Sequence, residues 1–556
     1  MLLWSAAALM STGLARAQTP PDAGSLLQQI EREQHPALPP KAAPAFEPPP
    51  PMQSLSGPTV TVHVFSFAGN KLLTSAQLAP AVAKFIDRPI SFGDLQNAAI
   101  AVATAYRNAG WIVRAYLPQQ EITGDTVTIQ IVEAKLGAVR IEGNTKRISS
   151  EQVKSIIEDA QAPGTPMNAK ALDRALLLVS DLPGVIVTGK LAEGEQQAQT
   201  DIVAAIADGP LFSGDVTADN SGERATGAGR LLADLNLNSP FGIGDRAAAV
   251  LLGSQGSNYE RADYSLPVGS DGWRVGLNAS HLDYKVITAE FAALDAHGTS
   301  TTAGLEASYP LLRSRLANLY VGFNVDDKRF DNSSGEITTT HYTIQTASAS
   351  VYGNVFDNFG GGGANNASIT LVQGIDDLAG SPNEAADALT TRDAGSFQKL
   401  RFSAARQQVI TDRFSLYADF SGQAASKNLD SSEKFYLGGP DGVRAYPVNE
   451  GGGAEGLLLN LEARERLPAN FNAVGFFDWG SVHVNKDNNI AGAALPNTDD
   501  LKGVGVSLAW QAKFGLSLKA TFAHRLGSNP DPTSTGDDQD GSHIENRVWL
   551  QASIPF

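Results

Sequence analysis

The stretch LSLKATFA, residues 516–523, carries apolar and mostly polar side chains in alternation. Successive side chains of an extended strand point to opposite faces, so this alternation predicts a strand with one apolar face. Segments of the same kind recur from residue 211 onward, separated by clusters of Gly, Asn, Asp and Ser. Further examples are residues 230–237, 246–253, 273–281, 319–325, 369–373, 414–420, 457–464 and 548–556.

Repeated strands of this kind over residues 210–556 predict a transmembrane antiparallel β-barrel. One face can meet lipid and the other a wet lumen, and closure leaves no unpaired edge. We count about sixteen segments, an even number that returns the chain to the side of the membrane from which it entered. Two soluble β-sandwich domains are the weaker alternative, because the apolar face never switches sheet and no proline-rich boundary divides the region.

The composition of the 556 residues narrows the class of protein. The net charge is −17, which argues against a basic surface for nucleic acid. Cysteine is absent, which excludes disulfides, thiolate metal sites and cysteine nucleophiles. No stretch of eighteen consecutive apolar residues predicts a transmembrane helix.

Residues 1–17 have the pattern of a secretory signal peptide. Residues 2–14 are apolar, and residues 15–17, Ala-Arg-Ala, form a small-x-small cleavage site. A basic segment before the apolar stretch is missing, so the true start codon stays open. Export of an acidic chain without membrane helices leaves three locations, which are the periplasm, the medium and an outer-membrane barrel.

A short helix and a proline-rich segment follow, over residues 18–35 and 36–58. Leu26, Leu27 and Ile30 form an apolar stripe at helical spacing. The second segment contains PALPPKAAPAFEPPPP, which cannot pack as helix or sheet and predicts an extended polyproline-type linker. The helix is therefore either part of a disordered N-terminal arm or a separate element with its own docking site.

An internal repeat follows the linker. FAGN at residues 67–70 matches IEGN at residues 141–144, a spacing of 74 residues. Each copy reads strand, helix, helix, strand, strand, and a capping residue, Thr74 in the first copy, precedes the first helix. The sequence therefore predicts two small α/β domains in series, at residues 59–135 and 136–209.

The motifs of the common enzyme classes are missing. There is no nucleophile elbow, no His-Glu-x-x-His and no phosphate loop ending in Gly-Lys-Ser/Thr. Residues 451–456 match Gly-x-Gly-x-x-Gly, but a strand pattern follows them where a dinucleotide site needs a helix. Asp537, Asp538 and Asp540 lack the spacing of a calcium loop. We therefore predict no catalytic residue, no cofactor and no metal site.

The stretch GGPDGVRAYPVNEGGG, residues 438–453, joins the eleventh and twelfth predicted strands and is an outer-side loop. Its glycines allow sharp folding, and its single arginine is Arg444. FFDWG, residues 476–480, places Asp478 inside the thirteenth strand among aromatic residues. A carboxylate there is costly unless it faces the lumen and has a partner. Arg444 is the predicted partner if the loop folds back into the barrel, because arginine stays charged and forks onto a carboxylate.

These features together resemble the outer-membrane transporters of two-partner secretion, the TpsB family of haemolysin-activation and filamentous-haemagglutinin-secretion type. FAGNKLLTSAQL, residues 67–78, and LDRALLLVSDLPGV, residues 172–185, look like sequences of the family's two POTRA domains. A helix on a proline-rich linker is similar to the family's plug helix. The family's motifs Val-Arg-Gly-Tyr and Phe-x-Asp-x-Gly map to Val443, Arg444, Ala445 and Tyr446, and to Phe476, Asp478 and Gly480.

The resemblance implies both a fold and a function. The fold is a plug helix, two periplasmic POTRA domains and a sixteen-stranded barrel in the bacterial outer membrane. The function is secretion of one large unfolded exoprotein of the TpsA type to the cell surface. The resemblance also implies that the loop arginine pairs with the strand aspartate and holds the loop tip inside the barrel. The family's glycine is Ala445 here, and alanine would be strained if its φ were positive.

The implied partners are outer-membrane lipids and a TpsA-type exoprotein, such as a β-helical adhesin or haemolysin. The sequence does not identify this cargo, and a contact-inhibition toxin and a protease stay open as well. Residues 548–556 resemble the C-terminal signal of barrels that the outer-membrane assembly machinery inserts. Leu95, Tyr106 and Trp111 are predicted in the core of the first α/β domain or in a substrate groove on it. An insertase of the same superfamily and a passive porin are the alternative functions. Membrane-protein assembly defects on depletion would identify the first, and conductance without secretion would identify the second.

Overall fold

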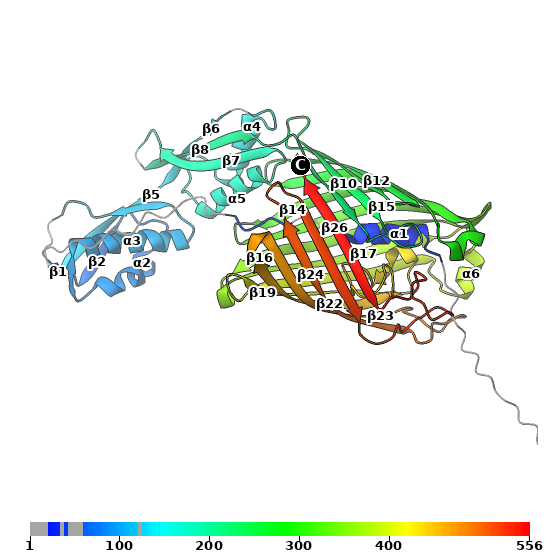
Figure 1. Cartoon of the computed structure of the whole chain (residues 1–556). Helices are drawn as coiled ribbons and strands as arrows, with labels where there is room; N and C mark the ends of the chain where they lie inside the picture. The colour runs from blue at the N-terminus through cyan, green and yellow to red at the C-terminus, as the bar shows by residue number, and fades with distance from the viewer. Residues whose placement is uncertain (1–19, 34–37, 43–58, 121–124, 144, 197) are drawn as a thin grey trace, which may run out of the picture.

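The computed structural model describes residues 20–33, 38–42, 59–120, 125–143, 145–196 and 198–556. Two small α/β domains lie at one end of a β-barrel, and a helix lies inside the barrel (Figure 1). The predicted signal peptide and most of the predicted linker lie outside the described residues.

The first α/β domain contains the predicted strands and helices and two further short strands. These are β1 (Thr59–Thr61), β2 (Val64–Ala68), α2 (Ser75–Val82), β3 (Pro89–Ser91), α3 (Phe92–Asn108), β4 (Val113–Tyr116) and β5 (Thr126–Glu133). Strand β5 is central, parallel to β2 and antiparallel to β4. Thr74 begins α2 with a capping box, because its hydroxyl accepts from the Gln77 amide and the Gln77 side chain accepts from the Thr74 amide.

The second α/β domain repeats this plan. Its elements are β6 (Lys135–Glu142), α4 (Ser150–Ala160), α5 (Ala169–Ser180), β7 (Val185–Glu193) and β8 (Gln199–Asp208). Strand β8 is central, parallel to β6 and antiparallel to β7. Ser149 caps α4 and Asn168 caps α5 through their side-chain oxygens. The strand–helix–helix–strand–strand order predicted from the internal repeat is therefore confirmed in the second copy. In the first copy two further short strands, β1 and β3, pair with each other outside the main sheet, and β3 lies between the two helices.

Backbone hydrogen bonds join the two domains to each other. The Ile112 amide donates to the Met167 carbonyl at 3.0 Å, and the Met167 amide donates to the Ala134 carbonyl at 2.9 Å. The Ala169 amide donates to the Gly110 carbonyl at 2.8 Å. Because hydrogen bonds depend on both distance and direction, these main-chain bonds favour one arrangement of the two domains.

The rest of the chain forms a closed barrel of sixteen strands, as predicted (Figure 1). Every neighbouring pair is antiparallel, and the last strand closes onto the first. Within the described residues no helix is long and apolar enough to cross a membrane. The strands are β9 (Phe212–Asp219), β10 (Arg230–Asn238), β11 (Arg246–Gly253), β12 (Ser257–Val268), β13 (Trp273–Lys285), β14 (Ala296–Arg313), β15 (Ala317–Ser334), β16 (Ile337–Asp357), β17 (Gly363–Asp377), β18 (Gly395–Val409), β19 (Phe414–Ala425), β22 (Glu455–Leu467), β23 (Phe471–His483), β24 (Thr498–Gln511), β25 (Ser517–Arg525) and β26 (Asn546–Pro555).

The period-two pattern of the sequence separates an apolar outer face from a polar inner face. In β25, Leu518 and Phe522 are 40% and 46% exposed on the outside of the barrel. Lys519 and Thr521 line a cavity of the lumen. An apolar belt on the outer face is what contact with lipid tails requires.

Arginine–aspartate pairs fix the second α/β domain to the barrel. The Arg313 guanidinium binds both carboxylate oxygens of Asp181 at 2.7 Å each, a bidentate geometry. Arg315 Nε donates to Asp173 Oδ1 at 2.5 Å. Asp173 lies in α5 and Asp181 directly follows it, so one helix is attached to the turn between β14 and β15.

Helix α1 (Ala23–Glu33) lies inside the barrel (Figure 1). The predicted stripe of Leu26, Leu27 and Ile30 is buried against an apolar patch of the lumen wall. The structure therefore favours the separate docked element over the disordered arm. The patch consists of Tyr259, Leu282, Tyr284, Phe330, Tyr342, Ile344 and Phe397.

Candidate functional site: the inward loop and its anchor

The chain between β19 and β22 returns into the barrel as a folded loop. A short helix η4 (Ser431–Glu433) and two short antiparallel strands, β20 (Phe435–Tyr436) and β21 (Gly452–Gly453), form its base. The loop joins the eleventh and twelfth strands, as predicted. Residues 442–448 at its tip are buried. We call residues 436–453 the inward loop.

Arg444 of the inward loop contacts Asp478 of strand β23. Its Nη2 donates to Oδ1 at 2.6 Å, its Nε donates to Oδ2 at 2.9 Å, and its backbone amide donates to Oδ2 at 3.0 Å. The Asp478 side chain is fully buried. Charge-assisted, bidentate bonds are the strong class of hydrogen bond, and removal of water strengthens them further.

The Asp478 carboxylate has a second donor from the neighbouring strand. Asn460 is the register partner of Asp478 across β22 and β23. Its Nδ2 lies 2.7 Å from Asp478 Oδ1 and 2.9 Å from the Gly442 carbonyl oxygen. Asn460 therefore links the wall carboxylate to the backbone of the inward loop.

Three further contacts complete the surroundings of Arg444. Nη1 donates to Glu462 Oε1 at 2.7 Å. The guanidinium carbon lies 3.5 Å from the centre of the Phe476 ring, a cation–π geometry. Trp549 Nε1 donates to the Arg444 carbonyl at 2.8 Å. The motif residue Phe476 thus acts as a platform under the arginine.

Sequence reasoning did not assign Asn460, Glu462 and Trp549 to this site. Asn460 and Glu462 stand at alternate positions of the predicted strand 457–464, on the face opposite the exposed Leu457 and Leu461. Both are polar residues on the inner face of a predicted barrel strand, and this pattern could have indicated that they lie at the site. Trp549 carried no such signal, because its contact with Arg444 depends on how the last strand closes the barrel.

The other motif residues pack around the anchor. Val443, Ala445 and Tyr446 are fully buried. Arg525 lies over the Tyr446 ring at 4.3 Å. A side chain at Gly480 would meet Leu437 of the loop base at 2.6 Å, so this glycine gives the loop room to approach the wall.

Ala445 is not strained by its backbone. It is not among the non-glycine residues with positive φ, so alanine is compatible with its conformation. The sequence left open whether alanine would be strained at this position, and the backbone conformation shows that it is not.

Helix α1 contacts the base of the inward loop. Arg32 donates from Nη1 to the Tyr436 carbonyl at 2.7 Å and from Nη2 to the Gly438 carbonyl at 3.0 Å. Gln28 Nε2 donates to the Lys434 carbonyl at 2.9 Å. The helix and the loop therefore form one continuous obstruction inside the lumen.

Ion pairs attach the same end of the helix to the barrel wall. Lys328 Nζ donates to Glu31 Oε2 at 2.8 Å, and Arg230 Nη1 donates to Glu33 Oε1 at 3.0 Å. Both pairs are largely buried, which limits screening by salt.

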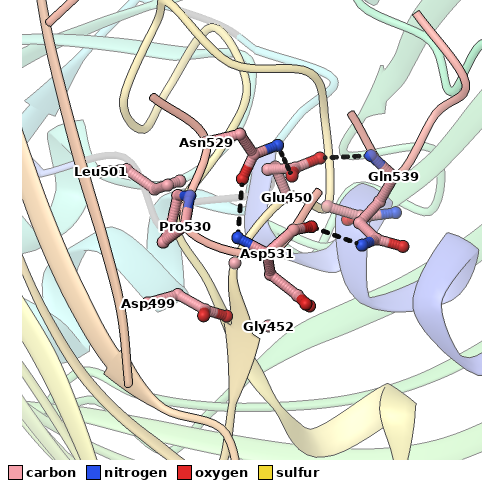
Figure 2. Close-up of a pocket in the computed structure, with 10 residues that line it drawn as sticks. Glu450, Gly452, Asp499, Leu501, Asn529, Pro530, Asp531 and Gln539 are labelled. Carbon is pink, nitrogen blue, oxygen red and sulfur yellow. Dashed lines mark hydrogen bonds between the residues drawn. The ribbon is translucent and has the colours of Figure 1, made fainter. Parts of the chain in front are cut away.

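Figure 2 shows Glu450 of the inward loop beside Asn529 and Gln539, which belong to the chain between β25 and β26. The Glu450 carboxylate accepts from Asn529 Nδ2 at 2.6 Å and from the Gln539 amide at 2.9 Å. These residues border a small cavity of about 70 Å³. Burial, with repulsion from Asp538, raises the pKa of Glu450 to about 8.

Residues 451–456, which match Gly-x-Gly-x-x-Gly in the sequence, lead into strand β22 where a dinucleotide site needs a helix. These residues form part of the base of the inward loop.

Leu95, Tyr106 and Trp111 lie in the core of the first α/β domain. Leu95 and Tyr106 are buried, and Trp111 packs against the same cluster while half-buried. The Tyr106 hydroxyl donates to Glu133 Oε1 at 3.0 Å, which satisfies the group inside the domain. Of the two placements that the sequence left open, the structure favours the core over the substrate groove.

Comparisons with known proteins agree with this architecture. Residues 199–497 match the model of the family described as haemolysin secretion/activation protein ShlB/FhaC/HecB, and residues 60–134 match the ShlB-type POTRA domain. The heme/hemopexin transporter protein HuxB of Haemophilus influenzae is 25% identical over 92% of both chains. The outer membrane transporter CdiB of Dickeya dadantii is 23% identical over 82% of both chains.

A solved structure of CdiB from Escherichia coli superposes with a TM-score of 0.70. It covers 97% of this chain and 100% of its own, at 20% identity, which shows a shared fold. The family match spans more than half of the chain and includes most of the barrel. The chain therefore belongs to the ShlB/FhaC/HecB family of haemolysin secretion/activation proteins and is a bacterial outer-membrane transporter of two-partner secretion.

Proposed function

We propose that this transporter passes one large, unfolded exoprotein of the TpsA type through its lumen, and that the Arg444–Asp478 pair keeps the path closed until the exoprotein arrives. The observation that carries the proposal is the burial of this pair inside the barrel, at 2.6 Å between Nη2 and Oδ1. A buried pair tends to fix one arrangement, since breaking it leaves a charge without a partner. The family motifs at Val443–Tyr446 and Phe476–Gly480 form the two sides of this lock.

Capture of the exoprotein takes place on the POTRA domains in this proposal. Strand β7 stands at the end of its sheet, and its nine residues are longer than any other edge strand of the two main sheets. Part of the β6 edge is already bonded, because the Leu136 amide donates to Thr165. An extended chain can add to the β7 edge through main-chain bonds, with Ile186 exposed beside it.

Passage through the lumen requires two movements. Helix α1 leaves its apolar patch, and the inward loop releases Asp478, because both segments occupy the space that the exoprotein needs. Folding of the exoprotein outside the cell makes the transfer irreversible. The step uses no nucleotide in this scheme.

We also propose the division of the chain and the remaining partners. A signal peptide covers 1–17, the plug helix 18–35, the linker 36–58, the POTRA domains 59–135 and 136–209, and the barrel 210–556. Outer-membrane lipids surround the apolar outer face. The assembly machinery reads strand β26, which leads to the terminal Phe556.

The experiment that tests the function compares extracellular proteins of cells with and without this gene. Loss of one large secreted protein, restored by the wild-type gene, is the expected result and names the partner. HuxB is described as a heme/hemopexin transporter, so its cargo is a first comparison for the protein that disappears. An unchanged set of extracellular proteins, together with loss of several outer-membrane barrels, would show an insertase instead.

A further inference from the structure

Strand β24 approaches the tip of the inward loop at a glycine, Gly503, and only the Ala445 methyl group lies between the two backbones at this point. Gly503 of β24 is the register partner of Asp478, so it lies directly beside the anchor. A Cβ atom placed on Gly503 would stand 2.7 Å from the Cβ of Ala445. Glycine inside a strand commonly marks a place where another backbone comes close.

The conflict at Gly503 is confined to this one methyl group. The next atoms that a Cβ there would meet are the His524 carbonyl oxygen at 3.5 Å and the Ala445 nitrogen at 3.6 Å, which are ordinary contacts. The φ of Gly503 lies outside the left-handed region, so alanine would add volume without backbone strain. Gly503 therefore differs from glycines that a turn requires.

The Ala445 methyl cannot turn away from such a contact. Alanine has no side-chain rotamer, so either the loop backbone or the strand must move. Ordinary contact begins at 3.4 Å, and the approach of 2.7 Å would need a displacement of 0.7 Å (3.4 − 2.7). Ala445 directly follows Arg444, whose amide and Nε lie 3.0 Å and 2.9 Å from Asp478. A displacement of that size takes such bonds beyond the usual 2.7–3.2 Å range.

We propose that Gly503 is a positioning residue of the lock, which seats the Ala445 methyl and so sets Arg444 at bonding distance from Asp478. The inference deepens the proposed function and depends on it for its effect on secretion. It also explains how alanine fits at a loop position where the family resemblance implies glycine. The missing side chain on the wall provides the room that the loop methyl uses.

The test measures loop position and secretion separately. The chain has no cysteine, so Asp441→Cys and Ser553→Cys can be labelled specifically with nitroxides. Both residues line one lumen cavity of about 550 Å³, with Asp441 on the loop and Ser553 on β26. Pulsed electron paramagnetic resonance on the full-length protein in lipid vesicles then reports the distance between loop and wall, and secretion of the exoprotein is measured in cells.

The expected result is a displacement that a second substitution reverses. Gly503→Ala should shift or broaden the nitroxide distance and lower the ratio of seated to released loop by about fivefold or more. Gly503→Ala combined with Ala445→Gly should restore the wild-type distance and secretion, because the two methyl groups no longer meet. Gly475→Ala is the matched control, since a Cβ on this glycine of the adjacent strand β23 meets nothing within 4 Å.

A second variant guards against poor assembly of Gly503→Ala. Ala445→Val enlarges the loop side while the wall stays unchanged, and the same displacement is expected. A wild-type distance in both Gly503→Ala and Ala445→Val, or no rescue by Ala445→Gly, would overturn the inference. If the distance shifts and is rescued while secretion never changes, Gly503 positions the loop but the lock does not control secretion. If Arg444→Ala moves the loop and stops secretion while Gly503→Ala and Ala445→Val do neither, the Arg444–Asp478 lock is supported and the proposed role of Gly503 is wrong.

Discussion

Arg444 and Asp478 lie 34 residues apart in sequence and are joined by three hydrogen bonds inside the barrel. One of the three comes from the Arg444 backbone, so the loop's main chain and side chain are both attached to one carboxylate. Asn460 binds the same carboxylate from the neighbouring strand. A loop that starts and ends at the outer rim is thereby attached to the wall of the lumen.

We expect Arg444→Ala and Asp478→Ala to lower secretion strongly while the barrel still inserts. Removing one partner of a buried pair costs about 3–5 kcal/mol, because the other charge stays buried, so the loop no longer holds the single closed arrangement from which we expect passage to begin. The measurement is the amount of exoprotein in the medium, with heat-modifiable migration of the barrel as the assembly control. Normal secretion by both variants would contradict the lock.

A simple charge swap should not restore the lock. Arg444→Asp with Asp478→Arg would place the new carboxylate near Glu462, which contacts Arg444 Nη1 in the wild type. Adding Glu462→Gln removes this repulsion, so the triple variant should secrete more exoprotein than the double variant. Equal secretion by the two would show that Glu462 does not act on the loop position.

Arg32→Ala should loosen the contact between helix α1 and the inward loop. The variant loses two hydrogen bonds from a charged donor, each worth about 1.5–3 kcal/mol. We expect larger and more frequent ion currents across planar bilayers. Glu31→Gln is the matched control on the same turn, because it weakens the Lys328 pair and leaves the loop contact intact.

Leu27→Ala should release the helix through its apolar face. Leu27 is 1% exposed against the lumen patch, and such a truncation costs about 2–5 kcal/mol. Limited proteolysis of intact vesicles is expected to cut the N-terminal segment faster. Leu27→Met conserves volume and should behave like the wild type. Equal cleavage of all three proteins would show that the patch does not hold the helix.

Alkaline pH should weaken the contact that holds the inward loop at Glu450. Its pKa is raised from 4.5 to about 8, so the seated loop holds the proton more tightly than the released loop does. This stabilisation is fully present below about pH 4.5 and is lost as the pH rises through about 8. Proteolysis of the loop should accelerate over this window. Glu450→Gln should flatten the profile, and an unchanged slope in that variant would assign the effect to another group.

Much of the architecture could be predicted because it depends on local periodicity. The alternation in residues 516–523 predicts a strand with one lipid-facing side, and Leu518 and Phe522 lie on that side. Thr74 predicts a helix start through its own capping chemistry. The pairing of Arg444 with Asp478 was predictable because a carboxylate in a strand among aromatic residues requires a partner, and Arg444 is the single arginine of the glycine-rich stretch 438–453 that could fold back into the barrel.

The remaining parts of the site depend on contacts that sequence spacing does not specify. Asn460 faces Asp478 through the register between β22 and β23, and a slip of one residue would turn its side chain to lipid. Trp549 reaches Arg444 only because β26 closes onto β9. Tyr106 is an aromatic residue of an amphipathic helix, and whether it fills a core or lines a groove is decided by neighbours from other elements.

Two arginine–aspartate pairs join the second POTRA domain to the barrel. The Arg313–Asp181 and Arg315–Asp173 pairs set the distance between the barrel and strand β7, which belongs to the same domain as the two aspartates. An exoprotein captured on β7 must then span a constant gap with free chain before its leading end can enter. If capture takes place on β7 as we propose, we expect the length of this free segment to limit which cargo is secreted, and a cargo whose recognition segment stands too near its leading end to be secreted poorly.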